Sequence, residues 1–139
     1  MIDHTGVIVT DFEKSKAFYS AALGAIGLSL LMEFPASVTG SIDIAGFGSP
    51  ESSKQGLGPE FWIGRGSPGS VPVHVAFRVP NRNLVDAFHK AALPAGGRDN
   101  GAPGLRQHYH PNYYGAFVLD PDGHRVEAVC HAPPGPASV

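Results

Sequence analysis

The sequence has little of several features that would narrow the class of protein. It contains a single cysteine among 139 residues, so no internal disulfide can form, and this usage is typical of a protein of the reducing cytoplasm. The ten lysines and arginines are scattered, with no run of three, and the formal net charge is −2. Nucleic acid is therefore not expected as a partner, because phosphate binding needs a clustered basic surface.

Long apolar segments are missing as well. No stretch approaches the roughly 20 apolar residues that span a bilayer, so no membrane contact is expected. The first residues, with Asp3 and His4 after Met1 and Ile2, do not form the basic and apolar regions of a secretory signal peptide. We therefore expect a cytoplasmic protein, and the hydrophobic fraction of 42% is enough for one compact core.

Glycine and proline, by contrast, are abundant, with 18 and 13 residues. They are concentrated at 46–58, 64–72, 94–104 and 132–139. Such clusters indicate loops and short connections between many strands. The last cluster predicts a flexible tail at 132–139, after a single domain.

An internal repeat runs through the chain at an offset of 70 residues, which places His4 over His74. Residues 4–27 then align with residues 74–97 without a gap, and nine of these 24 positions are identical. The matches include a histidine and a phenylalanine in phase, which composition does not explain. The chain therefore consists of two copies of one structural unit.

Each copy has the pattern of a strand, a helix and three further strands. The first strands are apolar and β-branched. Asp11 and Asn81 are good N-cap residues for the helices that follow, and Gly24 and Pro94 end those helices. We predict an α+β fold in which two βαβββ repeats form a cup around a shared concave face.

The single domain is expected at residues 1–131, with the first repeat at 2–65 and the second at 72–131. Residues 120–123, Asp-Pro-Asp-Gly, are typical of a tight turn, so the last two strands should form a hairpin. His124, which follows this turn, is expected at the surface.

Three residues form a candidate metal site. The repeat places His4 and His74 at equivalent positions in two first strands, and Glu127 interrupts the otherwise apolar last strand. A carboxylate on such a strand is costly to bury unless it is paired or bound to a metal. A lone strand histidine is more often a hydrogen-bonded core residue, but two equivalent histidines and an isolated glutamate favour a metal site. Two imidazoles and a carboxylate suit Fe, Mn, Zn or Ni and leave positions open for substrate.

These features resemble the vicinal oxygen chelate superfamily, which includes glyoxalase I, bleomycin-resistance proteins, fosfomycin-resistance enzymes and extradiol dioxygenases. The resemblance is carried by the repeat, by the first-strand histidines, by the helix end Phe18–Gly24 and by the ending at 120–127, Asp-Pro-Asp-Gly-His-Arg-Val-Glu. It extends from Ile2 to about His131. It implies a glyoxalase-like fold, a divalent transition metal held by His4, His74 and Glu127, and a homodimer.

The resemblance also implies a fourth ligand position on the last strand of the first repeat. Alignment of the hydrophobic neighbours places Trp62 opposite Glu127, whereas Glu60 lies on the same face and could substitute with a shifted register. We favour Trp62. Glyoxalase I would be expected to have a carboxylate there for proton transfer, so a strict glyoxalase I mechanism is less favoured.

Residues 106–114 are dense in groups that bind substrates or move protons. His108 and Tyr114 are candidate catalytic groups, and His110 and Tyr113 are candidate substrate contacts. The alternative is an exposed loop with aromatic anchors. Arg78 shares a strand face with His74 and could bind an anionic substrate, although an arginine at a strand end is as often exposed to solvent.

Two functions of different classes follow. The leading hypothesis is a metal-dependent enzyme, a lyase, isomerase, transferase or oxygenase, that acts on a small oxygenated substrate. The alternative is a metal-free protein of the bleomycin-resistance type that sequesters a small molecule, with Trp62, Tyr113 and Tyr114 as stacking surfaces. A degenerate, purely structural member of the family is a weaker third possibility.

Overall fold

The computed structural model describes residues 1–135, and each repeat has the predicted βαβββ order. The first half contains β1 (Thr5–Val9), α1 (Phe12–Gly24), β2 (Ser29–Phe34), α2 (Ala36–Thr39), β3 (Ile44–Gly48), α3 (Pro50–Lys54) and β4 (Phe61–Arg65). The second half contains β5 (His74–Arg78), α4 (Arg82–Ala92), β6 (Arg98–Leu105), β7 (Tyr114–Leu119) and β8 (Arg125–Cys130). The predicted tail at 132–139 falls partly outside the described residues.

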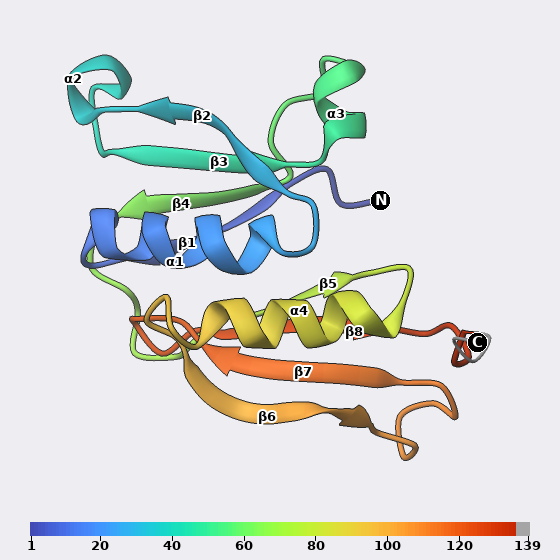
Figure 1. Ribbon diagram of the computed structural model, residues 1–139. Helices are drawn as coiled ribbons and strands as arrows, with labels where there is room; N and C mark the ends of the chain where they lie inside the picture. Colours follow the sequence, from blue (N-terminus) through green and yellow to red (C-terminus); the bar gives the residue numbers. More distant parts are fainter. Residues whose placement is uncertain (136–139) are drawn as a thin grey trace.

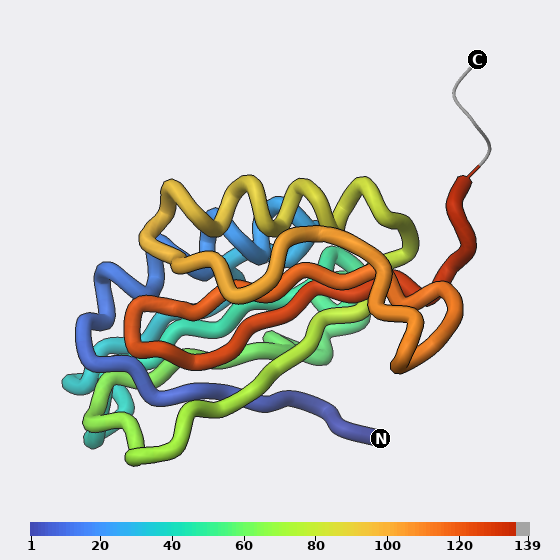
Figure 2. Tube along the Cα trace, turned by 90° about the horizontal axis from the view of Figure 1, so that it is seen from below, coloured from blue at the N-terminus to red at the C-terminus, as the bar shows by residue number. Residues whose placement is uncertain are grey.

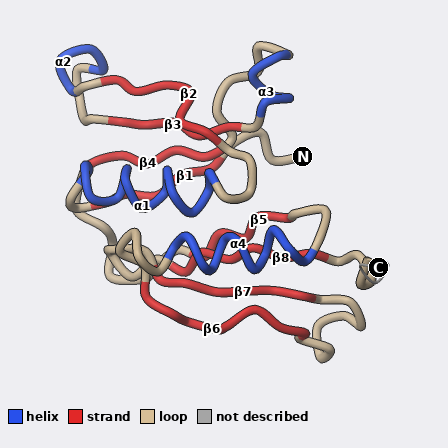
Figure 3. The backbone as a smooth tube through the Cα atoms, in the orientation of Figure 1, coloured by secondary structure: helices blue, strands red, loops and turns tan. Residues whose placement is uncertain are grey.

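The eight strands form two four-stranded sheets with the same topology. Their strand orders are β1-β4-β3-β2 and β5-β8-β7-β6, and in each sheet the first strand of the repeat pairs in parallel with the last. The two sheets lie side by side (Figures 1 and 3), and α1 and α4 cover the same side of the molecule (Figure 2). Within the part of the chain that the structure describes, no helix of this length lies on the other side of the sheets.

The two long helices begin where the sequence predicts. The Asp11 side chain accepts a hydrogen bond from the Lys14 N–H, 3.1 Å away, and the Asn81 side chain accepts one from the Leu84 N–H at the same distance. Each bond satisfies one of the free amide groups in the first turn of the helix. Both predicted N-caps are therefore confirmed.

Strand β6 is longer than its sequence predicts. The glycine and proline cluster at 94–104 predicts a loop with little extended structure, whereas β6 runs from Arg98 to Leu105. In the structure β6 is the edge strand of its sheet, and its register to β7 shifts at two places. An edge strand with bulges tolerates glycine and proline, because one side of its backbone needs no partner.

Alternation along the strands separates a core face from an open face. In β1 and β4 the side chains of Val7, Val9, Phe61 and Ile63 are buried against the helices, in the same cluster as Phe18 from α1. The residues between them, and their counterparts in the second sheet, face the side without helices. The candidate site lies on this open face.

The turn between β7 and β8 joins the two halves of the chain. The buried Asp120 carboxylate accepts a hydrogen bond from the Tyr19 hydroxyl, 2.6 Å away. The ring of His124 lies 2.8 Å from the Ile8 carbonyl through Nε2 and accepts the Val73 N–H at Nδ1, 3.1 Å away. The prediction that His124 lies at the surface is wrong, since it is only 4% exposed. Both ring nitrogens bind backbone groups that would otherwise be unsatisfied.

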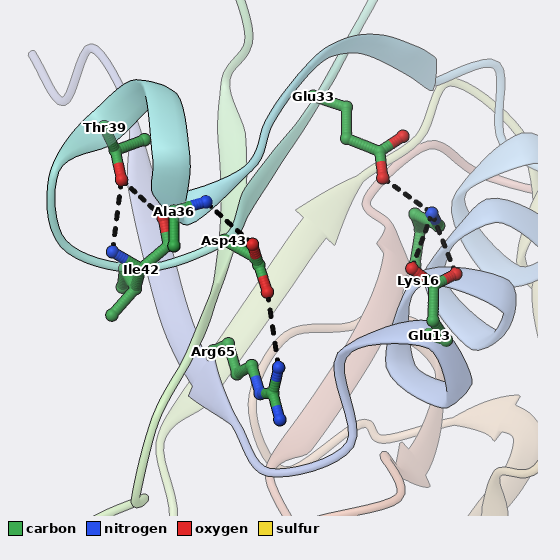
Figure 4. A network of polar contacts seen from close by, with 8 residues as sticks. All are labelled: Glu13, Lys16, Glu33, Ala36, Thr39, Ile42, Asp43 and Arg65. Carbon is green, nitrogen blue, oxygen red and sulfur yellow. Dashed lines mark hydrogen bonds and ion pairs between the residues drawn. The ribbon is translucent and has the colours of Figure 1, made fainter.

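Polar side chains also fix the distal end of the first sheet (Figure 4). Asp43 accepts the Ala36 N–H at the start of α2, 2.8 Å away, and lies 3.5 Å from Arg65. Lys16 on α1 donates to Glu33 on β2, 2.7 Å away, and this bond raises the pKa of Lys16. These contacts hold the β2–β3 hairpin on the first helix. Among residues 1–135, no helix is long and apolar enough to cross a membrane.

Candidate metal centre

The central side chain of the site is Glu127 on β8. Its neighbours Val126 and Ala128 face the helices, so alternation turns the carboxylate toward the open face. The side chain is nevertheless only 1% exposed. A carboxylate so far removed from water needs hydrogen-bond partners in the protein.

His74 is the first of these partners. Strand β5 runs parallel to β8 with Ala76 opposite Glu127, so His74 lies two residues back along the same face. The His74 Nε2 atom is 3.0 Å from Glu127 Oε2, and the His74 side chain is 52% exposed. A carboxylate and a half-exposed imidazole in contact are of the residue types that bind a divalent transition metal.

Tyr113, which immediately precedes β7, is the second partner of Glu127. Its hydroxyl donates a hydrogen bond to Glu127 Oε1, the oxygen that His74 does not contact. Burial and the adjacent carboxylate raise the pKa of Tyr113. The tyrosine therefore remains a hydrogen-bond donor and fixes the orientation of the carboxylate.

His4 is not part of this cluster. It precedes β1, its side chain is 59% exposed, and its Nδ1 atom lies 2.6 Å from Asp3. Within residues 1–135, no group of three or more histidine, cysteine, aspartate or glutamate side chains is arranged to hold a metal ion. One chain thus brings together two of the three predicted ligands. His4 and His74 do line one groove of about 690 Å³ that follows the free edge of β5.

The strand register defines which residue of the first repeat corresponds to Glu127. Gly6 pairs with Trp62, and Ala76, which lies 70 residues after Gly6, pairs with Glu127. Trp62 therefore occupies the equivalent position. The Glu60 carboxylate instead accepts hydrogen bonds from the backbone and hydroxyl of Ser49, at 2.7 and 3.0 Å, and so supports the start of α3. This geometry favours Trp62 over Glu60 as the residue opposite Glu127.

The remaining predicted site residues lie in different places. Arg78 lines the same groove as His74. His108 and His110 are exposed, and their rings pack against Tyr109, at 4.1 Å between centroids, and against His131, at 5.5 Å. Neither makes a hydrogen bond to His74 or Glu127.

Tyr114 faces the opposite side of the sheet from Tyr113. Its hydroxyl donates to Asp86 on α4, 2.7 Å away, and its ring lies 5.1 Å from the guanidinium of Arg82. Burial and Asp86 raise the pKa of Tyr114. Both tyrosines are predicted from the sequence to take part in the site, but only Tyr113 contacts Glu127. Successive side chains of a strand point to opposite faces of the sheet, and this alternation distinguishes Tyr113 from Tyr114.

Comparisons with known proteins place this geometry in a family. Residues 1–128 match the family model described as the glyoxalase/bleomycin resistance protein/dioxygenase superfamily. A solved glyoxalase/bleomycin resistance protein from Albidiferax ferrireducens is 26% identical, with a TM-score of 0.66 over 94% of this chain and 97% of that chain. No curated protein matches the chain.

Two further solved structures share the fold. A glyoxalase I variant from Zea mays is 25% identical, with a TM-score of 0.69, and the match covers 92% of this chain but 45% of that one. The fosfomycin resistance protein FosX from Listeria monocytogenes, solved with Mn(II) and a sulfate ion, is 17% identical, with a TM-score of 0.62 over 96% of this chain and 91% of that one.

Proposed function

We propose that this chain, which belongs to the glyoxalase/bleomycin resistance protein/dioxygenase superfamily, is a metal-dependent enzyme that acts on a small oxygenated substrate. The observation that carries the proposal is the buried Glu127 carboxylate, which lies 3.0 Å from Nε2 of the half-exposed His74 side chain. Burying a carboxylate is a cost to stability that a purely structural role does not require on an open sheet face. A relative of the same fold was solved with Mn(II), which agrees with a divalent ion here.

In this proposal His74 and Glu127 hold a divalent Fe, Mn, Zn or Ni ion, and Tyr113 orients Glu127. When bound, such an ion supplies a Lewis acid that polarises substrate oxygens and favours an anionic transition state. His74 and Glu127 leave most coordination positions open, as a catalytic site requires. Arg78, which lines the same groove, is the side chain of this chain that would bind a negatively charged part of the substrate.

We infer a homodimer in which His4 of a second copy completes the site. The inference is supported by the separation of the ligands, because His4 pairs with Asp3 while His74 pairs with Glu127. A twofold axis makes every contact occur twice, so each copy would donate His4 to one site and the other two ligands to the second.

Metal analysis of protein purified without chelator tests the enzyme. We expect close to one equivalent of a transition metal per chain, and its loss in His74→Ala. Less than about a tenth of an equivalent in the original protein, with no change in the variant, would contradict the proposal, because a catalytic site of this type binds its metal tightly.

Mixing two inactive variants tests the shared site. His4→Ala and His74→Ala should each retain little metal alone. When they are unfolded and refolded together, mixed dimers have one complete site, so metal content should recover to about a quarter of the original value. Recovery would fail if all three ligands came from the same chain.

Separate replacement of the two adjacent tyrosines by phenylalanine tests the role of Tyr113. Tyr113→Phe removes the hydrogen bond that orients Glu127, and we expect metal affinity to fall about 10- to 100-fold. Tyr114→Phe, which loses only its bond to Asp86, should leave metal affinity unchanged. Calorimetric titration with Mn(II) measures both, and equal affinities would exclude an orienting role for Tyr113.

A metal-free protein that sequesters a small molecule is the second candidate function. The observation that favours it is Trp62, an aromatic residue at the position equivalent to Glu127. Under this alternative the histidines and Glu127 would tolerate alanine with no loss of ligand binding. The metal analysis therefore separates the two functions.

A further inference from the structure

The open face of the first sheet forms an apolar hollow around Trp62. The hollow has a volume of about 370 Å³, within the range of small-molecule sites. Ile8, Ile42 and Ile44 line it together with Trp62, and the other polar side chains in the lining are His4 and Thr5. Among residues 1–135, no acidic side chain, lysine or arginine lines it.

Gly46 makes room for the indole ring of Trp62. The residues paired with Trp62 on the two neighbouring strands are Gly6 and Gly46. A Cβ atom on Gly46 would lie 2.9 Å from Trp62 Cζ3 and 2.5 Å from Pro59, so any larger residue would displace the ring. The ring therefore lies over Gly46.

A third glycine forms part of the same floor. A Cβ atom on Gly64 would meet Ile42 at 2.9 Å and Ile8 at 3.4 Å. These two side chains thus pack over Gly64 and form the wall of the hollow beside the indole. Trp62 itself is half-buried, which leaves part of its surface open to a ligand.

The two repeats use equivalent surfaces for different chemistry. In the second repeat the position opposite Ala76 is Glu127, with His74 and Tyr113 as partners. In the first repeat the position opposite Gly6 is Trp62, with apolar neighbours. One sheet thus presents groups that bind an ion or a polar atom, and the other presents an uncharged aromatic surface.

The hollow adjoins the groove that contains His74, because His4 and Thr5 line both of them. His4 is also the residue that we infer completes a metal site together with a second copy of the chain. A ligand in the hollow would therefore lie beside the site to which this His4 belongs.

We propose that this hollow binds an uncharged aromatic ring of the substrate, stacked on Trp62. The inference rests on the proposed function only in assigning the ring to that substrate. The ring is uncharged because a charged group would lose its hydration without gaining a partner among the lining residues. It is planar because an indole face offers offset stacking to another π-system and less to a saturated ring.

The single tryptophan of the chain makes the test direct. In metal-free protein labelled with nitrogen-15, the one indole N–H cross-peak belongs to Trp62. Titration with benzyl alcohol should shift this peak to saturation. Cyclohexylmethanol, a saturated alcohol of similar size, and the benzoate anion should both bind about tenfold more weakly. Because no metal is present, the outcome does not depend on whether the metal proposal is correct.

Two variants locate the binding. Trp62→Leu keeps an apolar side chain but removes the aromatic face, and saturation-transfer spectra of benzyl alcohol should show at least about a tenfold loss of affinity. Phe34→Leu removes an exposed aromatic residue that does not line the hollow, and binding should remain unchanged. Equal binding by Trp62→Leu would overturn the proposal. So would an indole peak that responds to protein concentration and not to the alcohol, since a second copy would then cover the face.

Discussion

Glu127→Gln should abolish metal binding while leaving the metal-free protein at least as stable as the original. Glutamine keeps the shape of the side chain and can still accept the Tyr113 hydroxyl bond, but it provides no negative charge for a cation. We expect metal affinity to fall by at least about a hundredfold, the upper end of what loss of an orienting hydrogen bond costs. The free energy of unfolding without metal should be unchanged or higher by about 1 kcal/mol, because a buried charge has been removed.

Plasma mass spectrometry of the purified variant and urea unfolding in the presence of a chelator measure the two effects. Glu60→Gln is the matched control, since Glu60 is the other glutamate proposed for a ligand position and instead binds Ser49. It should retain the metal. A stability loss in Glu127→Gln without a change in metal content would identify Glu127 as a structural residue, and loss of metal in Glu60→Gln would restore Glu60 as a ligand.

Asp120→Ala should be the most destabilising single substitution outside the apolar core. The carboxylate of Asp120 is fully buried and accepts the Tyr19 hydroxyl at 2.6 Å and the backbone N–H groups of Asp122 and His124 at 2.9 and 2.8 Å. Alanine leaves three donors without a partner, and we expect the free energy of unfolding to fall by about 3–5 kcal/mol. This is a large part of the roughly 5–15 kcal/mol that stabilises a domain.

Thermal and urea unfolding measure the loss, and two further variants separate its causes. Tyr19→Phe removes one donor and should cost about 1 kcal/mol. Glu13→Ala removes a carboxylate whose side chain is 75% exposed, and should change stability by less than about 0.5 kcal/mol. If Asp120→Ala behaved like Glu13→Ala, the turn between β7 and β8 would not hold the two halves together.

The fold could be predicted from the sequence because the repeat is visible in it. Two equal units are defined by His4 and His74 and by the helix ends, which recur at the same offset. Each unit has one segment with the 3.6-residue period of a helix, among short apolar runs typical of strands. The extent of β6 could not be predicted, because Gly101 and Pro103 indicate a loop unless the strand is known to lie at an edge. Edge position is a property of the whole sheet.

Part of the candidate site could also be predicted from the sequence. Alternation alone turns Glu127 away from the core side of β8, and the same rule assigns Tyr113 to that face and Tyr114 to the other. Alternation does not predict the hydrogen bond between Tyr113 and Glu127, because Tyr113 lies before the first residue of β7. The burial of His124 was missed for a similar reason, since its partner Ile8 lies 116 residues away.

The parallel pairing of each first strand with the last strand of its repeat has a consequence for biosynthesis. Strand β5 cannot gain its partner until β8, about fifty residues later, has left the ribosome, and the turn before β8 is also the one that bonds to β1. Contacts so distant in sequence make folding slow, because the loop must close before the pairing stabilises it. Glu127 can therefore reach His74 only after β8 has been synthesised, and a chain released before that point would leave β5 and β7 without the strand that lies between them.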